Sequence, residues 1–281
     1  MLEEALEHLR IRPEGIYLDA TAGLGGHTGA IAGRLTTGFV IANDADPESL
    51  EMARKNTADA AGRIRFHCGE FSNLREALRE NGVEQVDGLL ADLGVSRFQL
   101  TDASRGFSIL TDSALDMRLN QSKGATAADL VNYTAERQLA DLIYQLGEER
   151  RARKIARAIV RARPIRSTRH LADVVERAAH RTGRIHPATQ TFQALRMATN
   201  NEQGELDSLL ELAPEIVKSK GRVVVISFMS LEDRKVKQKF RSLQQEGRAE
   251  TITRRPLRPT EAEIKANPAA RSAKMRALEM N

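Results

Sequence analysis

The chain has 281 residues, of which 41% are hydrophobic and 29% are charged, a composition typical of a globular protein and unlike that of disordered or membrane proteins. Its single cysteine, Cys68, excludes an internal disulfide bond and a zinc site built from several thiolates, and it fits a reducing compartment. The formal net charge of +5 favours an anionic partner. Because the first residues are acidic and no run reaches the ~18 apolar residues of a membrane span, we expect a cytoplasmic protein without a membrane segment.

Strand-like and helical runs alternate in the first third of the chain. The predicted strands are 16–21, 40–43, 64–68 and 88–92, and the helices between them begin near residue 28 and cover 47–56 and 74–80. This alternation predicts a parallel sheet with helices on both faces. The strand pattern resumes at 221–228, and strands at 250–254 and 275–280 would complete the sheet with a terminal hairpin.

Between residues 101 and 204 the sequence contains helical patterns and no convincing strand. These helices are predicted at 127–132, 136–146, 148–162, 170–181 and 187–200, and a further one at 205–219 precedes the next strand. We therefore expect an α/β fold, a Rossmann-like sheet interrupted after its fourth strand by an inserted helical domain. The expected division is a core in two parts, 1–100 and 205–281, around a substrate-recognition insertion, 101–204.

A glycine-rich turn follows the first predicted strand, where residues 19–27 read Asp-Ala-Thr-Ala-Gly-Leu-Gly-Gly-His. Its glycines permit positive φ angles and let a ligand approach the backbone. Nucleotide binders, dehydrogenases and methyltransferases share such turns, and some turns only connect two elements. Asp44, about 20 residues further on, is the expected partner of the ribose hydroxyls of an adenosyl cofactor, whereas Asp46, before Pro47, is better explained as a helix N-cap.

Ligands of open α/β sheets bind beyond the carboxyl ends of the strands. Phe71 at this edge could stack on an adenine or pack in the core. Asp92 could accept a hydrogen bond from a cofactor amine or an incoming exocyclic amine, or cap the next turn. His27 is better explained by a backbone contact or a place at the helix start than by acid–base catalysis. The candidate cofactor residues are Gly25, Gly26, His27, Asp44, Phe71, Asp92 and Gln99.

A strongly basic run occupies residues 150–169, with nine Lys or Arg and no acidic residue. A helix from Glu148 would place the cations on one face and apolar residues on another. The absence of carboxylates favours contact with phosphates over a merely solvated face. Since aromatic residues make up only 4% of the chain, a broad base-stacking platform is not expected. We expect mostly electrostatic binding of the substrate, with one base extruded into the pocket. The candidate contacts are Arg150, Arg153, Lys154, Arg157 and Arg161.

Several longer motifs closely resemble those of the bacterial RsmH (MraW) family, and they extend over nearly the whole chain. They are Gly25-Gly26-His27, Asp92-Leu93-Gly94-Val95-Ser96 with Gln99-Leu100, Arg105-Gly106-Phe107-Ser108, Leu115-Asp116-Met117-Arg118, Gly147-Glu148-Glu149-Arg150, Ile155-Ala156-Arg157-Ala158-Ile159, Pro187-Ala188-Thr189 with Phe192-Gln193-Ala194-Leu195-Arg196, and Ser230-Leu231-Glu232-Asp233-Arg234.

The resemblance implies a class I methyltransferase fold and an S-adenosylmethionine-dependent enzyme. The implied reaction is methylation of the N4 amine of a cytidine in the decoding region of 16S ribosomal RNA, with the small-subunit RNA or the assembled small subunit as partner. The family's cofactor positions fall on the seven candidates above. Asp92 or a nearby backbone carbonyl would accept the amine hydrogens, and neither this chemistry nor residue spacing indicates a metal.

The chain departs from the family pattern at three places. The family has a further segment before the first residue, Met229 stands where a histidine is usual, and the tail motif 267–274 has alanine where arginine is usual. These changes affect substrate handling more than cofactor binding. Alternatives are therefore an amino-methyltransferase acting on another nucleic acid and a cofactor-binding RNA scaffold with impaired catalysis. A nicotinamide dehydrogenase is disfavoured because Thr28 occupies the place of the third Rossmann glycine.

Overall fold

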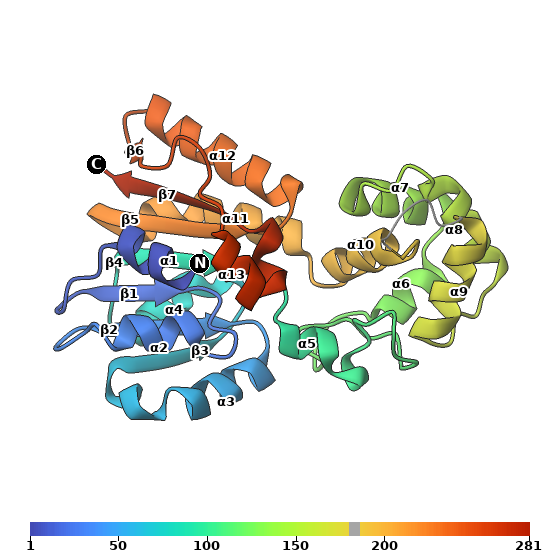
Figure 1. The fold of residues 1–281 in the computed structure, drawn as a ribbon, viewed down its shortest axis with the longest axis horizontal. Helices are drawn as coiled ribbons and strands as arrows, with labels where there is room; N and C mark the ends of the chain where they lie inside the picture. The colour runs from blue at the N-terminus through green and yellow to red at the C-terminus, as the bar shows by residue number, and fades with distance from the viewer. Residues whose placement is uncertain (180–185) are drawn as a thin grey trace. The chain divides into compact units, whose positions relative to one another are not determined.

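The computed structural model describes residues 1–179 and 186–281, and it divides into two compact units (Figure 1). Unit 1 comprises Met1–Gly94 and Gln203–Asn281, and unit 2 comprises Val95–Glu202. The chain therefore leaves unit 1 once, after the fourth strand of its sheet, and returns to it once. Each unit has a hydrophobic core of its own.

A seven-stranded sheet forms the centre of unit 1, in the order β3-β2-β1-β4-β5-β7-β6. The strands β1 to β5 are parallel, and β7 is antiparallel to both β5 and β6. The Rossmann-like sheet and the terminal hairpin predicted from the sequence are thus confirmed. The bounds are β1 (Ile16–Asp19), β2 (Phe39–Asp44), β3 (Ile64–Cys68), β4 (Val86–Asp92), β5 (Val217–Ser227), β6 (Ala249–Thr251) and β7 (Lys274–Met280).

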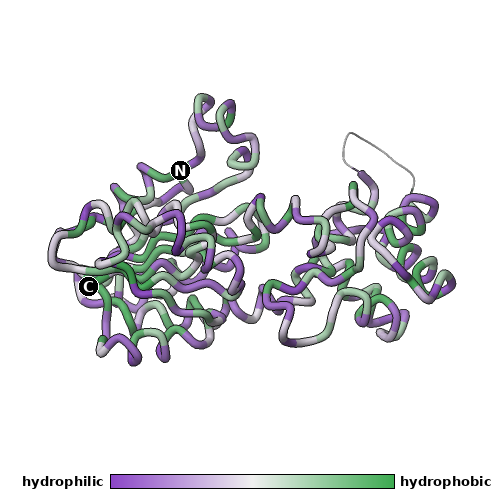
Figure 2. The backbone as a smooth tube through the Cα atoms, turned by 90° about the horizontal axis from the view of Figure 1, so that it is seen from below, coloured by the Kyte–Doolittle hydropathy of each residue, from purple (hydrophilic) through white to green (hydrophobic). Residues whose placement is uncertain are grey.

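Helices cover both faces of this sheet and bury the two apolar faces of its strands. Because both faces are covered, central strands such as β4 are buried along almost their whole length, and Figure 2 shows the strands among the most hydrophobic parts of the chain. One face carries α1 (Leu2–Leu9), α2 (Gly26–Ala32) and α3 (Pro47–Asn56), and the other carries α4 (Leu74–Glu80), α11 (Glu202–Ile216) and α12 (Ser230–Gln245). The short elements are η1 (Ala58–Arg63), η2 (Phe71–Asn73), α13 (Glu261–Ala266) and η4 (Pro268–Ser272).

Helix α3 illustrates how local sequence sets an element of this unit. The Asp46 carboxylate accepts a hydrogen bond from the backbone N–H of Glu48 at 3.0 Å and another from the Ser49 hydroxyl at 3.1 Å. Pro47 occupies the first helical position, where its missing N–H costs nothing. The N-cap predicted for Asp46 is confirmed.

Unit 2 is helical and packs around its own apolar cluster, which includes Ile143, Ile155 and Leu171. Residues 106–126 form no helix or strand. The helix predicted at 170–181 begins earlier, at Thr168, and residues 180 and 181 of that prediction lie outside the described residues. The bounds are α5 (Arg97–Thr101), η3 (Ala103–Arg105), α6 (Ala127–Tyr133), α7 (Glu136–Gly147), α8 (Ala152–Arg161), α9 (Thr168–Ala178) and α10 (Thr189–Thr199).

Most predicted boundaries differ from the observed ones by a few residues, and two of the larger differences have a clear structural cause. Strand β5 begins at Val217 rather than at residue 221, because Val217 pairs with Val86 before the register shifts to Gly88 opposite Arg222. Helix α8 begins at Ala152 rather than at Glu148. Glu148 has a φ of 53° and ends α7, so the prediction of one helix from residue 148 was wrong.

Candidate active site

Three carboxylates stand at the carboxyl edge of the sheet in unit 1. β2 ends at Asp44, β1 at Asp19 and β4 at Asp92, and these parallel strands are neighbours in that order. Ligands of such sheets bind at this edge. The structure brings together here most of the predicted cofactor residues, which lie at or just after the ends of β1 to β4, namely Gly25, Gly26, His27, Asp44, Phe71 and Asp92.

The turn after β1 requires glycine at particular positions. Gly23 has a φ of 51° and Gly25 a φ of 90°, a region that residues with a Cβ rarely adopt. A Cβ on Gly25 would lie 2.8 Å from Thr57 Cγ2, whereas a Cβ on Gly26 would meet no atom within 4 Å. Gly25 is thus needed by the fold, while Gly26 leaves open space at the start of α2.

Asp44 binds this turn directly. Its Oδ2 accepts a hydrogen bond from the Gly23 N–H at 2.8 Å, and its Oδ1 accepts one from the Asp46 N–H at 2.9 Å. Burial raises the pKa of the Asp44 carboxyl to about 6, although the two backbone hydrogen bonds oppose the shift. The carboxylate is half-buried, and each oxygen keeps a lone pair for a ligand donor.

A second polar network joins the ends of β1 and β4. The fully buried Asp19 accepts hydrogen bonds from the Thr21 N–H at 3.1 Å and from the Thr28 hydroxyl at 2.6 Å, and Thr21 Oγ1 accepts one from the Asp92 N–H at 2.6 Å. Burial raises the pKa of Asp19 to about 6. We did not predict Asp19, Thr21 or Thr28 as site residues. Asp19 carried one available signal, since it is a carboxylate at the end of an apolar strand.

Asp92 and His27 face each other across this edge. His27 Nδ1 lies 3.7 Å from Asp92 Oδ2, and their side chains are 17% and 32% exposed. Among the described residues, neither Asp92 Oδ1 nor His27 Nε2 has a hydrogen-bond partner, although both atoms are buried. Burial raises the pKa of Asp92 to about 6 and lowers the pKa of His27. Asp92 is therefore not the turn cap considered in the sequence analysis, and it retains a free acceptor.

Asn43 connects the loops that follow β1 and β3. Its fully buried side chain donates to the Ala20 carbonyl at 3.2 Å and to the Gly69 carbonyl at 2.9 Å. Phe71 follows Gly69, begins η2 and packs, partly buried, against the core. This contact bears out the packing alternative for Phe71 without testing its stacking on a ligand. Asn43 was missed because an amide inside a strand carries no recognisable motif.

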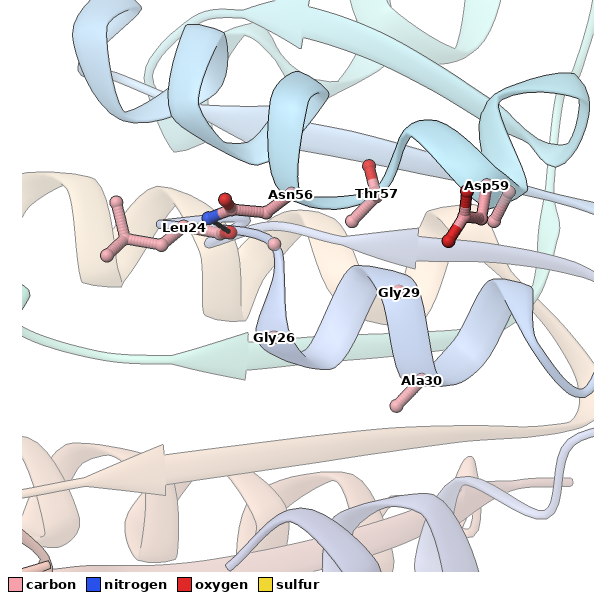
Figure 3. A pocket seen from close by; sticks show the side chains of 9 residues that line it. Leu24, Gly26, Gly29, Ala30, Asn56, Thr57 and Asp59 are labelled. Carbon is pink, nitrogen blue, oxygen red and sulfur yellow. Dashed lines mark hydrogen bonds between the residues drawn. The ribbon is translucent and has the colours of Figure 1, made fainter.

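A hollow of about 500 Å³ lies beside the glycine turn, between α2 and the segment that joins α3 to η1 (Figure 3). Asn56 closes one end, where its Nδ2 donates to the Leu24 carbonyl at 2.9 Å. Gly25 and Gly26 line the hollow, but Asp44 and Asp92 do not. The hollow therefore shares only the glycine turn with the row of carboxylates.

Gln99, the seventh predicted cofactor residue, belongs to unit 2. Its side chain is 3% exposed and accepts a hydrogen bond from the Ser96 N–H at 2.8 Å, while Ser96 Oγ accepts one from the Gln99 N–H at 3.2 Å. This reciprocal capping box fixes the start of α5. Within unit 2, Gln99 thus has a structural role at the start of this helix.

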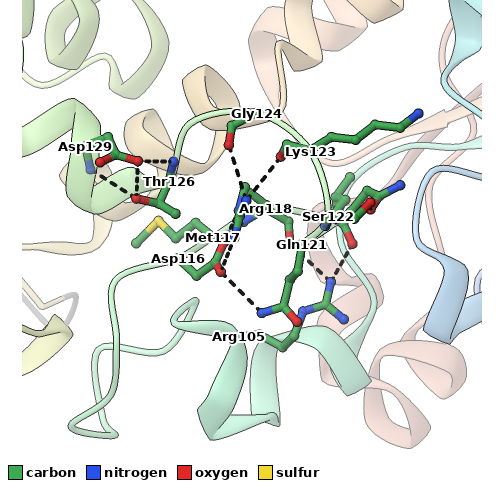
Figure 4. Close-up of polar contacts among 12 residues, drawn as sticks. Arg105, Asp116, Met117, Arg118, Gln121, Ser122, Lys123, Gly124, Thr126 and Asp129 are labelled. Carbon is green, nitrogen blue, oxygen red and sulfur yellow. Dashed lines mark hydrogen bonds and ion pairs between the residues drawn. The ribbon is translucent and has the colours of Figure 1, made fainter.

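Polar contacts order the irregular segment 106–126 of unit 2 (Figure 4). Arg105 is 1% exposed, and its Nη2 donates to the carbonyls of Leu119 at 2.7 Å and Arg118 at 3.2 Å. Asp116 receives two hydrogen bonds from the Arg118 guanidinium, at 2.7 and 2.9 Å, and this pairing holds the pKa of Asp116 below its usual range against the opposing effect of burial. The family-like motifs around residues 105 and 116 therefore build a loop framework.

The basic run of unit 2 is only partly helical. In α8, Ile155 and Ile159 are buried while the cations of the other face are exposed. Arg150 precedes the helix, in a turn where Glu149 Oε1 accepts a hydrogen bond from the Arg151 N–H at 2.7 Å. Arg157 Nε lies 3.4 Å from Glu136 Oε1 of α7, so a carboxylate from outside the run neutralises one of its cations. The exposed predicted contacts are Arg150, Arg153, Lys154, Arg157 and Arg161.

No helix in 1–179 or 186–281 is long and apolar enough to cross a membrane. Within the same ranges, no group of three or more His, Cys, Asp or Glu side chains is arranged to hold a metal ion.

The sheet order, the glycine turn and the carboxylates at the carboxyl edge are those of a class I methyltransferase fold. A model of the MraW methylase family matches residues 1–281. Relatives named "Ribosomal RNA small subunit methyltransferase H" include one from Solibacter usitatus, 66% identical over 100% of this chain and 98% of its own, and one from Acidobacterium capsulatum, 48% identical over 99% and 96%. The crystal structure of an rRNA methylase from Streptococcus thermophilus aligns with a TM-score of 0.48 and 11% identity over 99% of this chain and 94% of that chain.

The chain belongs to the MraW methylase family. This membership confirms the predicted family, the methyltransferase activity and S-adenosylmethionine as the cofactor. It also removes the nicotinamide dehydrogenase from the alternatives.

Proposed function

We propose that this protein transfers a methyl group from S-adenosylmethionine to the N4 amine of a cytidine in the decoding region of 16S ribosomal RNA. The observation that carries the proposal is the match, over the whole chain, to relatives named as small-subunit ribosomal RNA methyltransferases, at up to 66% identity among those compared. Ribosomal RNA as substrate also fits the cytoplasmic location expected from the sequence.

The residues at the carboxyl edge suit an adenosyl cofactor. The glycine turn offers backbone without side chains, and Gly26 stands beside open space. Asp44, whose oxygens each keep a lone pair beyond the bonds to Gly23 and Asp46, would accept the ribose hydroxyls. Phe71 would lie against the adenine. Bound S-adenosylmethionine supplies an electrophilic methyl group on a sulfonium centre.

Asp92 is the proposed catalytic residue. A cytidine N4 is a weak nucleophile because its lone pair is delocalised into the ring, so the protein must orient the amine and accept its hydrogens. Asp92 Oδ1 is buried and has no partner among the described residues, which makes it an acceptor for an N4 hydrogen. His27, 3.7 Å from the other oxygen, would hold that carboxylate in place.

The RNA contacts proposed for unit 2 are the exposed cations of the basic run, Arg150, Arg153, Lys154, Arg157 and Arg161. Such side chains bind phosphates without reading sequence. Before RNA binds, Arg157 contributes least to the positive charge of this run, since Glu136 already pairs with it. Gln99 stays among the proposed cofactor residues on the family resemblance alone.

The test is a methylation assay with labelled S-adenosylmethionine on small ribosomal subunits and on naked 16S RNA, followed by nucleoside analysis. Label in N4-methylcytidine, lost in Asp92→Ala but retained in Asp59→Ala as a surface control, supports the proposal. Label in another nucleoside would favour an amino-methyltransferase with a different target. Cofactor binding without transfer to either substrate would favour the scaffold.

A further inference from the structure

Helix α12 of unit 1 has an unusually basic outer face. Between Arg234 and Gln245 the chain has five Lys or Arg and no Asp or Glu. Val236, Phe240 and Leu243 are buried in the core. Arg234, Lys237 and Arg241, spaced by three and four residues, therefore share the opposite side of the helix, where Arg234 and Arg241 are exposed and Lys237 partly exposed.

The carboxylates near α12 already pair with cations other than Arg234, Lys237 and Arg241. Asp207 binds Lys235 Nζ at 2.6 Å. Asp233 pairs with Arg276 at 2.6 Å and with Lys274 at 3.6 Å. Within residues 1–179 and 186–281, no ion pair links Arg234, Lys237 or Arg241 to a carboxylate. Their charge is therefore uncompensated in the free protein.

A second basic segment lies beside β7, one of the strands that α12 packs against. Residues 252–260 contain three arginines and no acidic residue, and Arg254 and Arg255 are exposed. This segment runs along β7, where Thr253 Oγ1 accepts the N–H of Ala277 at 2.9 Å. Ala277 is next to Arg276, the partner of Asp233, so the segment and α12 meet neighbouring residues of one strand. Figure 1 shows α12 beside β7 and β6.

The position of α12 links this face to the cofactor edge within unit 1. Asp92 pairs in register with Ile226 of β5, and α12 starts at Ser230. From there Arg234 to Arg241 extend over about 10 Å of helix. A membrane surface is a poor fit, because the apolar residues of an interfacial helix must reach the lipid and those of α12 are buried in the core.

We propose that Arg234, Lys237 and Arg241 form a phosphate-binding surface for the RNA substrate on the methyltransferase unit itself, in addition to the basic run of unit 2. Arg254 and Arg255, in the segment beside β7, would add two further phosphate contacts. The inference rests on the proposed function for its RNA partner. Each engaged phosphate releases condensed counterions, so these cations must add to the salt dependence of RNA binding.

The test compares the full-length protein with a triple variant, Arg234→Gln, Lys237→Gln and Arg241→Gln, in binding to a 16S RNA fragment between 50 and 300 mM KCl. We expect affinity at the lowest salt to fall at least tenfold. The magnitude of the slope of log K against log salt should decrease by about 2, because each phosphate contact on a single strand contributes about 0.7. Affinity for S-adenosylmethionine and the melting temperature should not change. In the double variant Arg254→Gln, Arg255→Gln the magnitude of this slope should decrease by about 1.4.

Two controls separate this surface from a general charge effect. The triple variant Arg54→Gln, Lys55→Gln, Arg79→Gln removes the same charge from exposed sites on α3 and α4, and Lys235→Gln removes the paired lysine of α12. Both should keep the slope of the unchanged protein. An α12 variant that keeps slope and affinity while the unchanged protein binds and methylates RNA would overturn this inference alone, whereas an unchanged protein that neither binds nor methylates RNA would overturn the proposed function as well.

Discussion

The ionisation of Asp44 should make cofactor affinity depend on pH. The pKa of this carboxyl is about 6 in the fold against 3.8 in the unfolded chain, so at pH 5 only about a tenth of the molecules carry the charged acceptor. If the ribose hydroxyls need the carboxylate, the dissociation constant for S-adenosylmethionine should rise about tenfold from pH 7.5 to pH 5. Calorimetric titration at both pH values measures this change.

The variant Asp44→Asn tests the assignment. Its amide can accept from only one of the N–H groups of Gly23 and Asp46, so affinity at pH 7.5 should fall by about 1 to 3 kcal/mol, and the tenfold pH effect should largely disappear. Titration of the ligand is common to both proteins and cancels. Asp59→Asn, which changes an exposed carboxylate near the turn, should retain the pH effect. Equal affinities for Asp44→Asn and the unchanged protein would refute the ribose role.

Stability should respond to pH with the opposite sign. A carboxyl whose folded pKa is raised above the unfolded value contributes stability that is full below about pH 3.8 and lost as the pH rises through about 6. Relative to Asp44→Asn, the cofactor-free protein should therefore gain stability on acidification from pH 7 to pH 5 while it loses affinity. A parallel loss of both would indicate that acid simply disrupts the site.

Three further predictions concern the glycine turn, the loop framework and the basic run. Gly25→Ala should lower the melting temperature because its Cβ meets Thr57, whereas Gly26→Ala should preserve stability yet weaken cofactor binding, and equal melting temperatures would contradict the turn geometry. Arg105→Met should destabilise unit 2 by about 2 to 4 kcal/mol, since the partly buried carbonyls of Arg118 and Leu119 lose their donor, and an unchanged urea midpoint would count against it. Replacing Arg153, Lys154 and Arg157 together with glutamine should reduce the magnitude of the slope of log K against log salt for RNA binding by about 2. An identical slope would leave α8 as a solvated face.

The sequence predicted those parts of the fold that local patterns specify. Local sequence patterns predicted β3, α3 and α4 with the bounds that the structure has. The Asp-Pro pair predicted the start of α3. The start of β5 was missed because residues 218–220 are polar and only the pairing of Val217 with Val86 places the strand earlier. The start of α8 was missed because Glu148, which is not a glycine, adopts a left-handed conformation and ends α7.

The strand ends, the glycine turn and the family motifs could be predicted from the sequence, because each depends on residues close together in the chain. The contacts between distant residues could not, since side-chain geometry depends on how the chain packs. Only the tertiary structure shows that Asp44 accepts a hydrogen bond from Gly23 and that Asn43 donates to two loops. It also shows that Asp92 Oδ1 has no partner among the described residues. It also distinguished the cations of α12 that form an ion pair from those that form none, because an ion pair depends on which carboxylates folding brings close.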